Sequence, residues 1–339
     1  MSEKNLEIFA QVADMVIEED PIAGPKTPAF VRLMSLQFTE AEARLALKIR
    51  TTGGKLDELV ERTGMKKQKL EKMLHRMADK GTVYYDSSDN PTYRIIQMAA
   101  PGFIETGLWG GIKYPFSVEL AKAINQVIKD WSDEKLCKLG FPFAPVWAAL
   151  DALPKEADQS LNLAEAIKHE GHWSVSPCPC RLSQWIVDPG NHCEHMLETC
   201  IHTGDQSRWA VKHGMARALT YEELVALLKQ CNENGLVHTL NVQNCICNCC
   251  NDCCTIFRGQ NQGHKVFVPS PFVPEVEEDS CNGCDQCVDR CPTHAIKARN
   301  EEEFEEAVTV NHDTCIGCGV CVTTCKPGAL NLVERAAAA

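Results

Sequence analysis

The spacing of apolar residues predicts helices in the first half of the chain. Over about residues 66–80, apolar side chains recur at i, i+3, i+4 and i+7, so one helix face carries Leu70, Met73, Leu74 and Met77. A further amphipathic helix is expected near 117–131, and its apolar side is formed by Ile124, Val127, Ile128 and Trp131. We expect a helical lead and a proline-rich linker in residues 1–30, and a helical connector in residues 101–175.

Capping and turn residues mark the boundaries of the unit between these two segments. Thr39 and Glu42 form a capping box that opens one helix, and Gly64 is placed to end the next. Two β-prone stretches within 82–96 follow the third helix, and the turn sequence DSSDNP separates them. Three helices followed by a two-stranded ribbon resemble a winged helix-turn-helix domain, which we expect over residues 31–100.

Cysteine content adds metal chemistry to this picture. The chain has 20 cysteines in 339 residues, and 19 of them follow residue 170. Its first 20 residues lack the basic and apolar segments of a secretory signal peptide, and no apolar run approaches the ~18 residues of a membrane span. We therefore expect a cytoplasmic protein with no membrane insertion. In that reducing compartment, clustered cysteines are more often metal ligands than disulfides.

Eight of the cysteines form a tandem repeat near the end of the chain. Each run has the spacing Cys-x2-Cys-x2-Cys-x3-Cys, and the runs are offset by 34 residues. This spacing is typical of bacterial ferredoxins with two [4Fe–4S] clusters, in which the fourth cysteine of each run binds the other cluster. The predicted ligands are Cys281, Cys284, Cys287 and Cys325 for one cluster, and Cys315, Cys318, Cys321 and Cys291 for the other. The corresponding 2[4Fe–4S] ferredoxin fold is expected over residues 280–335.

That repeat has one departure from the family pattern and one alternative interpretation. Pro292 directly follows the last cysteine of the first run, whereas Lys326 precedes Pro327 in the second. The departure leaves all eight ligands in place. A zinc-binding or disulfide-linked repeat is the alternative, and eight cysteines at both spacings argue against it.

Ten further cysteines lie in two groups within residues 176–268, which we expect to form a separate Cys-rich domain. They are Cys178, Cys180, Cys193 and Cys200, followed by Cys245, Cys247, Cys249, Cys250, Cys253 and Cys254. One cubane needs four thiolates, and adjacent cysteine pairs suit neighbouring or unusual clusters. One or two additional iron–sulfur clusters are therefore favoured. Zinc is the alternative, because four-cysteine zinc sites tolerate varied spacings.

Several polar residues near these thiols are candidates for a supporting role. Arg181 is placed to donate to a cluster sulfur, and ion pairing is its alternative role. Asp252 is a candidate oxygen ligand or an exposed loop carboxylate. A histidine ligand raises the potential of a cluster, and ordinary hydrogen bonding is the alternative for each of His192, His195, His202 and His238.

The order of these motifs resembles a group of 4Fe–4S dicluster ferredoxin-like proteins of anaerobic bacteria. The resemblance covers most of residues 30–330 and includes the winged helix, the CPCR motif, the CxCNCCxxCC run and the C-terminal dicluster repeat. It implies an α+β multidomain chain that transfers electrons within an oxidoreductase system. It names no substrate and no catalytic residue.

Three functions remain open from the sequence. The first is a relay of single electrons to or from a partner oxidoreductase, and the net charge of −12 favours a basic docking face on that partner. The second is a redox-sensing DNA-binding regulator, which Lys69, Lys72 and Arg76 favour and the acidic chain disfavours. The third is a reductase with an unusual cluster in the Cys-rich domain. No nucleotide fingerprint is present, and a homodimer is left open.

Overall fold

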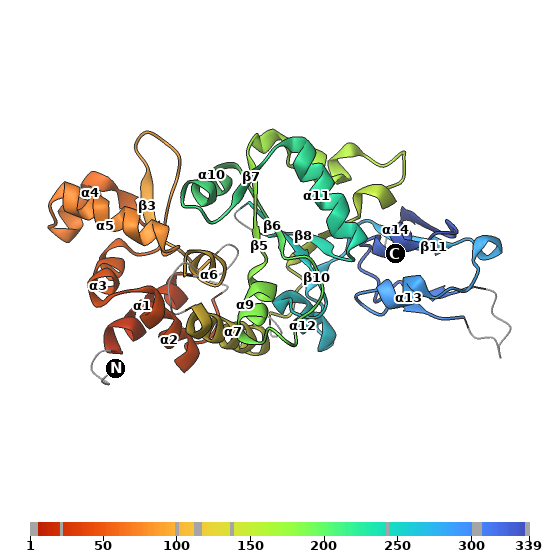
Figure 1. Cartoon of the computed structure of the whole chain (residues 1–339), viewed down its shortest axis with the longest axis horizontal. Helices are drawn as coiled ribbons and strands as arrows, with labels where there is room; N and C mark the ends of the chain where they lie inside the picture. The colour runs from red at the N-terminus through yellow and green to blue at the C-terminus, as the bar shows by residue number, and fades with distance from the viewer. Residues whose placement is uncertain are drawn as a thin grey trace.

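The structure is a computed structural model that describes residues 6–20, 23–98, 102–111, 117–135, 139–241, 244–299 and 307–335. A helical N-terminal part, a central sheet with helices around it, and a C-terminal part follow one another along the long axis (Figure 1). No helix of these described segments is both long and apolar enough to cross a membrane.

The N-terminal part confirms the helices and the ribbon that were expected there. Its elements are α1 (Glu7–Glu19), α2 (Pro28–Gln37), α3 (Glu40–Ile49), β1 (Gly54–Lys55), α4 (Leu56–Thr63), α5 (Lys67–Asp79), β2 (Val83–Tyr85) and β3 (Thr92–Ile95). Thr39 and Glu42 form both hydrogen bonds of the capping box, and Gly64 ends α4 in the left-handed conformation. The three strands form an antiparallel sheet in the order β1–β3–β2.

The β2–β3 ribbon packs against the centre of the molecule. It contacts α10 (Gly204–Lys212), where the Tyr84 and Trp209 rings lie 5.8 Å apart. His213, which follows α10, has Nδ1 2.7 Å from Asp79 Oδ1 and Nε2 3.0 Å from Tyr85 Oη. The N-terminal part is therefore attached to the sheet through the ribbon.

The central sheet has seven strands in the order β10–β4–β8–β9–β6–β5–β7. The strands are β4 (Ala144–Trp147), β5 (Trp173–Pro177), β6 (Glu198–Thr203), β7 (Arg217–Leu219), β8 (Val237–Asn241), β9 (Cys245–Cys249) and β10 (Phe267–Val268). The surrounding helices are α6 (Glu105–Gly111), α7 (Ser117–Glu134), α8 (Leu163–Ala166), α9 (Pro179–Val187), α11 (Tyr221–Glu233) and α12 (Thr255–Asn261). β4 and the first three residues of β5 belong to the segment 101–175, which was expected to be a helical connector. That segment is thus partly built into the sheet, because its strands pair with partners far along the chain.

The two faces of this sheet have different chemistry. On one face, Ile201 and Ile246 pack against Leu224 and Leu228 of α11 in a buried apolar cluster. Alternate residues of a strand point to opposite faces, so the other face of β9 carries its three cysteines. One face of the sheet is therefore a conventional core, and the other is lined by thiols.

The C-terminal part consists of two halves that repeat each other. Its elements are β11 (Phe272–Val276), α13 (Gln286–Arg290), β12 (Ile296–Lys297), β13 (Thr309–Val310), α14 (Val320–Thr324) and β14 (Leu330–Glu334). β11 pairs with β14 and β12 pairs with β13, both antiparallel. The helices α13 and α14 are offset by the same 34 residues as the cysteine runs, so the sequence repeat is also a structural one.

Candidate metal centres

The loops of the C-terminal cysteine repeat have matching left-handed backbone positions. Gly283 and Gly317 hold the same place in the two runs, with φ of 62° and 69°. Asp285 and Gly319 form the next equivalent pair, with φ of 56° and 72°. Left-handed residues turn the backbone so that nearby amide groups can point inward, and glycine adopts this conformation without steric cost. The repeat is thus encoded in loop geometry as well as in cysteine spacing.

The thiols of this part lie near the partners expected for crossed cluster ligation. Burial raises the pKa of Cys287 to about 11, and the nearby Cys325, Cys281 and Cys284 thiols add to this effect. Burial also raises the pKa of Cys318 to about 12, and among the nearby thiols Cys291 adds most to this rise. A thiol with such a raised pKa becomes a thiolate when a metal replaces its proton. The thiols near Cys287 belong to the ligand set predicted for one cluster, and Cys291, near Cys318, belongs to the set predicted for the other.

Backbone amides donate to two of these sulfurs. Ala295 N lies 3.1 Å from Cys291 Sγ, and Gly317 N lies 3.4 Å from Cys315 Sγ. Such donors stabilise negative charge on a ligated thiolate. Among the described residues, no three of the eight thiols lie within 4.8 Å of one another.

Residues 280–329 match the family model described as a 4Fe-4S dicluster domain. The match indicates iron–sulfur cluster binding, and the loops, buried thiols and amide donors fit such clusters. Comparison with curated proteins and with solved structures gives no match for the chain. The dicluster domain, as residues 280–329 are called below, covers only the C-terminal part, and the ten upstream thiols lie outside it.

Elements far apart in the sequence bring the ten upstream thiols together. Cys178 precedes α9 and Cys180 lies in its first turn, whereas Cys200 lies on β6. β9 contributes three cysteines and the loop to α12 contributes Cys250, Cys253 and Cys254. Cys193 comes from the loop between α9 and β6. The antiparallel pairing of β6 with β9 is what joins the two cysteine groups.

A cavity of about 160 Å³ lies between α9, the thiol-lined face of the sheet and α12. Trp131, Phe143 and Ile256 contribute apolar walls. Seven of the ten upstream thiols line it: Cys178, Cys180, Cys200, Cys247, Cys249, Cys250 and Cys254. An apolar pocket with convergent thiols suits a metal–sulfur group, because thiolates bind soft metals and the walls exclude water.

Arg181 provides a test of whether this cavity fits an anionic group. Its side chain lines the cavity and is fully buried. Nη2 donates to Thr199 Oγ1 and, at 3.2 Å, to the Asn248 carbonyl oxygen, whereas Nε and Nη1 have no hydrogen-bond acceptor. A buried cation with two unpaired donors is costly unless negative charge lies beside it. Thiolates and an anionic iron–sulfur cluster supply such charge.

The same guanidinium influences the thiols around it. Hydrogen bonding with Cys180 lowers the pKa of Cys178 to about 7, and the charge of Arg181 contributes to this. Hydrogen bonds from Cys193 and Cys253 hold the pKa of Cys250 well below its usual range, again with help from Arg181. Some of the thiols are therefore prepared as thiolates, the form that binds metal.

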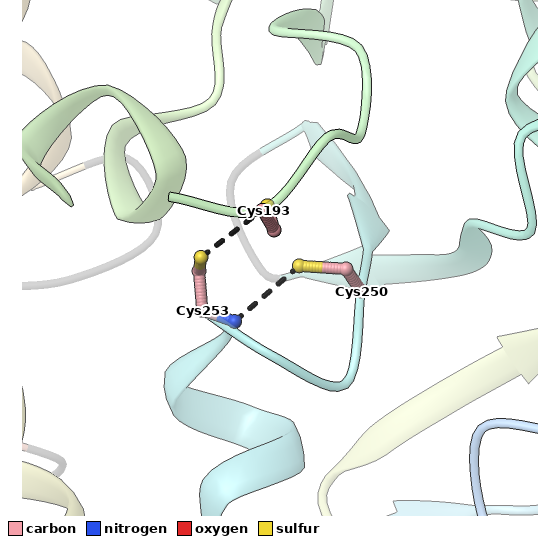
Figure 2. A group of neighbouring side chains, drawn as sticks. All are labelled: Cys193, Cys250 and Cys253. Carbon is pink, nitrogen blue, oxygen red and sulfur yellow. Dashed lines mark hydrogen bonds between the residues drawn. The ribbon is translucent and has the colours of Figure 1, made fainter. Parts of the chain in front are cut away.

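Three thiols form a second group at the edge of the cavity. Cys193, Cys250 and Cys253 point toward one another from two loops (Figure 2). Cys253 Sγ lies 3.4 Å from Cys193 Sγ, and Cys253 N donates to Cys250 Sγ at 3.4 Å. Asp252, the candidate oxygen ligand, is exposed and has Oδ2 3.7 Å from His195 Nε2.

The four histidines have different surroundings. The His192 ring lies 4.4 Å from the Trp185 ring at a tilt of 37°, and His238 is buried between Asn232 and Asn248. His202 is fully buried, and burial lowers its pKa to about 3, so its ring is neutral. One of its ring nitrogens lies within 4.8 Å of the Cys200 and Cys245 sulfurs. The sequence contained a clue to this, because a Cys-x-His pair on a strand points both side chains to one face.

Proposed function

We propose that the chain relays single electrons between its dicluster domain and a further iron–sulfur cluster in the thiol-lined cavity. The observation that supports this most directly is a shared apolar cluster. Cys318 of the dicluster domain packs in it together with Cys249 and Cys254, which line the cavity. Ala149 N also donates to the Cys318 carbonyl oxygen at 2.9 Å, so the domain rests directly on the end of β4. Iron–sulfur cubes exchange single electrons with little rearrangement.

Four of the cavity thiols suit a single cubane. Cys178 and Cys180 lie at the start of α9, Cys249 ends β9 and Cys254 precedes α12, so three elements direct these thiols to the cavity. Four cysteine ligands leave no open iron for a substrate, which favours electron transfer over catalysis at this centre. Arg181 would donate its unpaired N–H groups toward the sulfur atoms of this cluster.

The charge of the chain supports a basic redox partner. The net charge is −12, and each oxidised cubane with four thiolates adds further negative charge. Complementary charge accelerates the encounter of redox proteins and orients them. We therefore propose a partner oxidoreductase with a basic docking face.

DNA binding is less well supported, although the N-terminal elements have the order of a winged helix. The ribbon that would act as the wing packs on α10 and places Tyr84 against Trp209. Arg76, one of the candidate phosphate-binding residues, pairs with Glu42 at 3.2 Å. We propose that this unit serves as a packing module within the chain.

Metal analysis of the full chain, purified without oxygen, tests the relay. The dicluster domain accounts for about eight iron atoms, so a cavity cluster raises the count to about twelve. Cys180→Ser and Cys254→Ser should each remove about four iron atoms and leave the spectra of the dicluster domain intact. Cys231→Ala is the matched control, because Cys231 is buried in the core on the opposite face of the sheet and is not among the residues that line the thiol cavity. A wild-type count of about eight would refute the cavity cluster.

A further inference from the structure

Four potential ligands form two facing pairs on one face of the central sheet. Cys200 and His202 are alternate residues of β6, and Cys245 and Cys247 are alternate residues of β9. Alternate residues of a strand share a face. The strands pair antiparallel with His202 opposite Cys245, which places Cys200 opposite Cys247. The four side chains therefore meet above the junction of β6 and β9.

The spacing of three of these ligands, Cys200, His202 and Cys245, fits one metal ion better than a cubane. Cys200 Sγ and Cys245 Sγ lie 3.6 Å apart, and a ring nitrogen of His202 lies within 4.8 Å of both. The Cys247 thiol is within hydrogen-bonding reach of Cys200 and Cys245. Thiolates around one tetrahedral zinc lie about 3.8 Å apart, as follows from Zn–S bonds of about 2.3 Å. A cubane binds each thiolate to a separate iron and spreads the sulfurs more widely, as in the dicluster domain.

The hydrogen bonds of His202 leave one ring nitrogen available. Ser176 Oγ donates to the Met215 carbonyl oxygen at 2.9 Å, and it lies 2.9 Å from His202 Nε2. Because the serine proton is used on Met215, the serine oxygen accepts from Nε2–H, and this assigns the tautomer. Nδ1 then carries a lone pair and is buried with no hydrogen-bond partner. A metal-binding histidine typically donates its other N–H to such an oxygen.

We propose that Cys200, His202, Cys245 and Cys247 hold one zinc ion at a closed site, separate from the iron–sulfur clusters. Three thiolates and a neutral imidazole complete the tetrahedral coordination of a structural zinc site. The ion would join β6 to β9, and so the first upstream cysteine group to the second. It would have no redox role, which leaves the electron path to the thiols on the other side of the cavity.

X-ray absorption at the zinc edge of the full chain, purified without oxygen, tests the site directly. We expect about one zinc per chain, with three sulfurs at about 2.3 Å and one nitrogen at about 2.0 Å. His202→Ala should reduce zinc at least fivefold with the iron count unchanged, and His202→Cys should restore zinc with four sulfur neighbours.

The control is His238→Gln on β8, on the other side of β9 from His202, because both ring nitrogens of His238 already have hydrogen-bond partners and this variant should keep its zinc. A wild-type protein that contains no zinc after growth with zinc, or zinc with four sulfur neighbours, would overturn the proposal. So would a His202→Ala variant that loses iron and keeps zinc. The wild-type spectrum decides the question even if a variant does not fold. The cavity cluster is tested by the iron count and the zinc site by the zinc spectrum. About eight iron atoms in the wild type would refute the cluster and leave the zinc result unaffected, so the two proposals fail separately.

Discussion

Arg181 and His202 are buried polar side chains that face the same group of thiols from different elements. Each has polar atoms without a hydrogen-bond partner in a place where water has little access. Buried polar groups are nearly always paired in folded proteins, so each unpaired atom calls for a partner. The partners that fit the surrounding thiols are a metal–sulfur group for Arg181 and a metal ion for His202.

Replacing Arg181 by Gln should lower the reduction potential of the cavity cluster. Reduction adds negative charge, which the buried guanidinium stabilises, and a hydrogen bond from a charged donor contributes about 1.5–3 kcal/mol. Loss of about 1.5 kcal/mol corresponds to a decrease of roughly 60 mV for one electron. An EPR-monitored redox titration measures this. Arg258→Gln, which removes an exposed guanidinium paired with Asp133, should leave the potential unchanged. Equal potentials in the Arg181 variant and the wild type would contradict the assigned role.

His238 should make the folded chain sensitive to acid. Burial lowers its pKa to about 4, whereas an unfolded histidine titrates near 6.5. As the pH falls through 6.5, the unfolded chain binds a proton that the folded chain does not, so stability falls until about pH 4. Between pH 7.5 and 5.5 this amounts to about 1.3 kcal/mol. Urea unfolding without oxygen at both pH values measures the loss of stability between them. This loss should be smaller by about 1.3 kcal/mol in His238→Gln than in the wild type, and an equal loss would exclude the effect.

At the scale of elements, the two halves of the dicluster domain have the left-handed backbone conformation at equivalent positions but use different residues there. The first half places Asp285 and His294 in the left-handed conformation where the second half has Gly319 and Gly328. Non-glycine residues enter this region at a cost, and Asp and His are among those that do so most readily. The cysteine loops therefore require a left-handed residue at these positions even where the two halves differ in sequence.

Gly317→Ala should destabilise the dicluster domain far more than Gly328→Ala. Both residues have positive φ, of 69° and 74°, so both variants carry the left-handed strain of about 1 kcal/mol or more. At Gly317 a Cβ would also lie 2.3 Å from the Phe272 carbonyl oxygen, whereas at Gly328 it meets nothing within 4 Å. Thermal unfolding and cluster retention during dilution without oxygen would measure the contrast. Equal losses would mean that φ strain alone determines the cost.

At the scale of the whole molecule, the dicluster domain is fastened to the central sheet near the cavity. Arg290 of α13 donates to the carbonyl oxygens of Asn232, at 3.1 Å, and Glu233, where α11 ends. A cation is favourable at a helix C-terminus, where the last carbonyls have no helical partners. The ribbon on α10 fastens the N-terminal part at the opposite side of the sheet (Figure 1).

Arg290→Ala should loosen this attachment and slow electron exchange between the dicluster domain and the cavity cluster. Loss of hydrogen bonds from a charged donor costs about 1.5–3 kcal/mol. Reduction of one cluster by a rapid pulse, followed optically, measures the exchange rate. The exposed Lys326→Ala is the control and should leave the rate unchanged. A rate in Arg290→Ala equal to that of the wild type would indicate that other contacts hold the domain in place.

Local sequence patterns determined a large part of this protein. The helix with the capping box at Thr39 forms as expected, since its signal lies within one turn of the chain. The dicluster domain was predictable for the same reason, because its ligands follow a short fixed spacing. These features need no knowledge of distant partners.

Only the tertiary structure decided how the ten upstream thiols are grouped. Cys200 and Cys245 are 45 residues apart, and the register between β6 and β9 brings their sulfurs to 3.6 Å. The burial of Arg181 and the contact of Cys318 with the cavity walls likewise depend on packing between elements. Strand pairing depends on long-range register, which residue spacing does not encode. The sequence by itself therefore specified which ligands are present, and the fold decided which of them can share a metal.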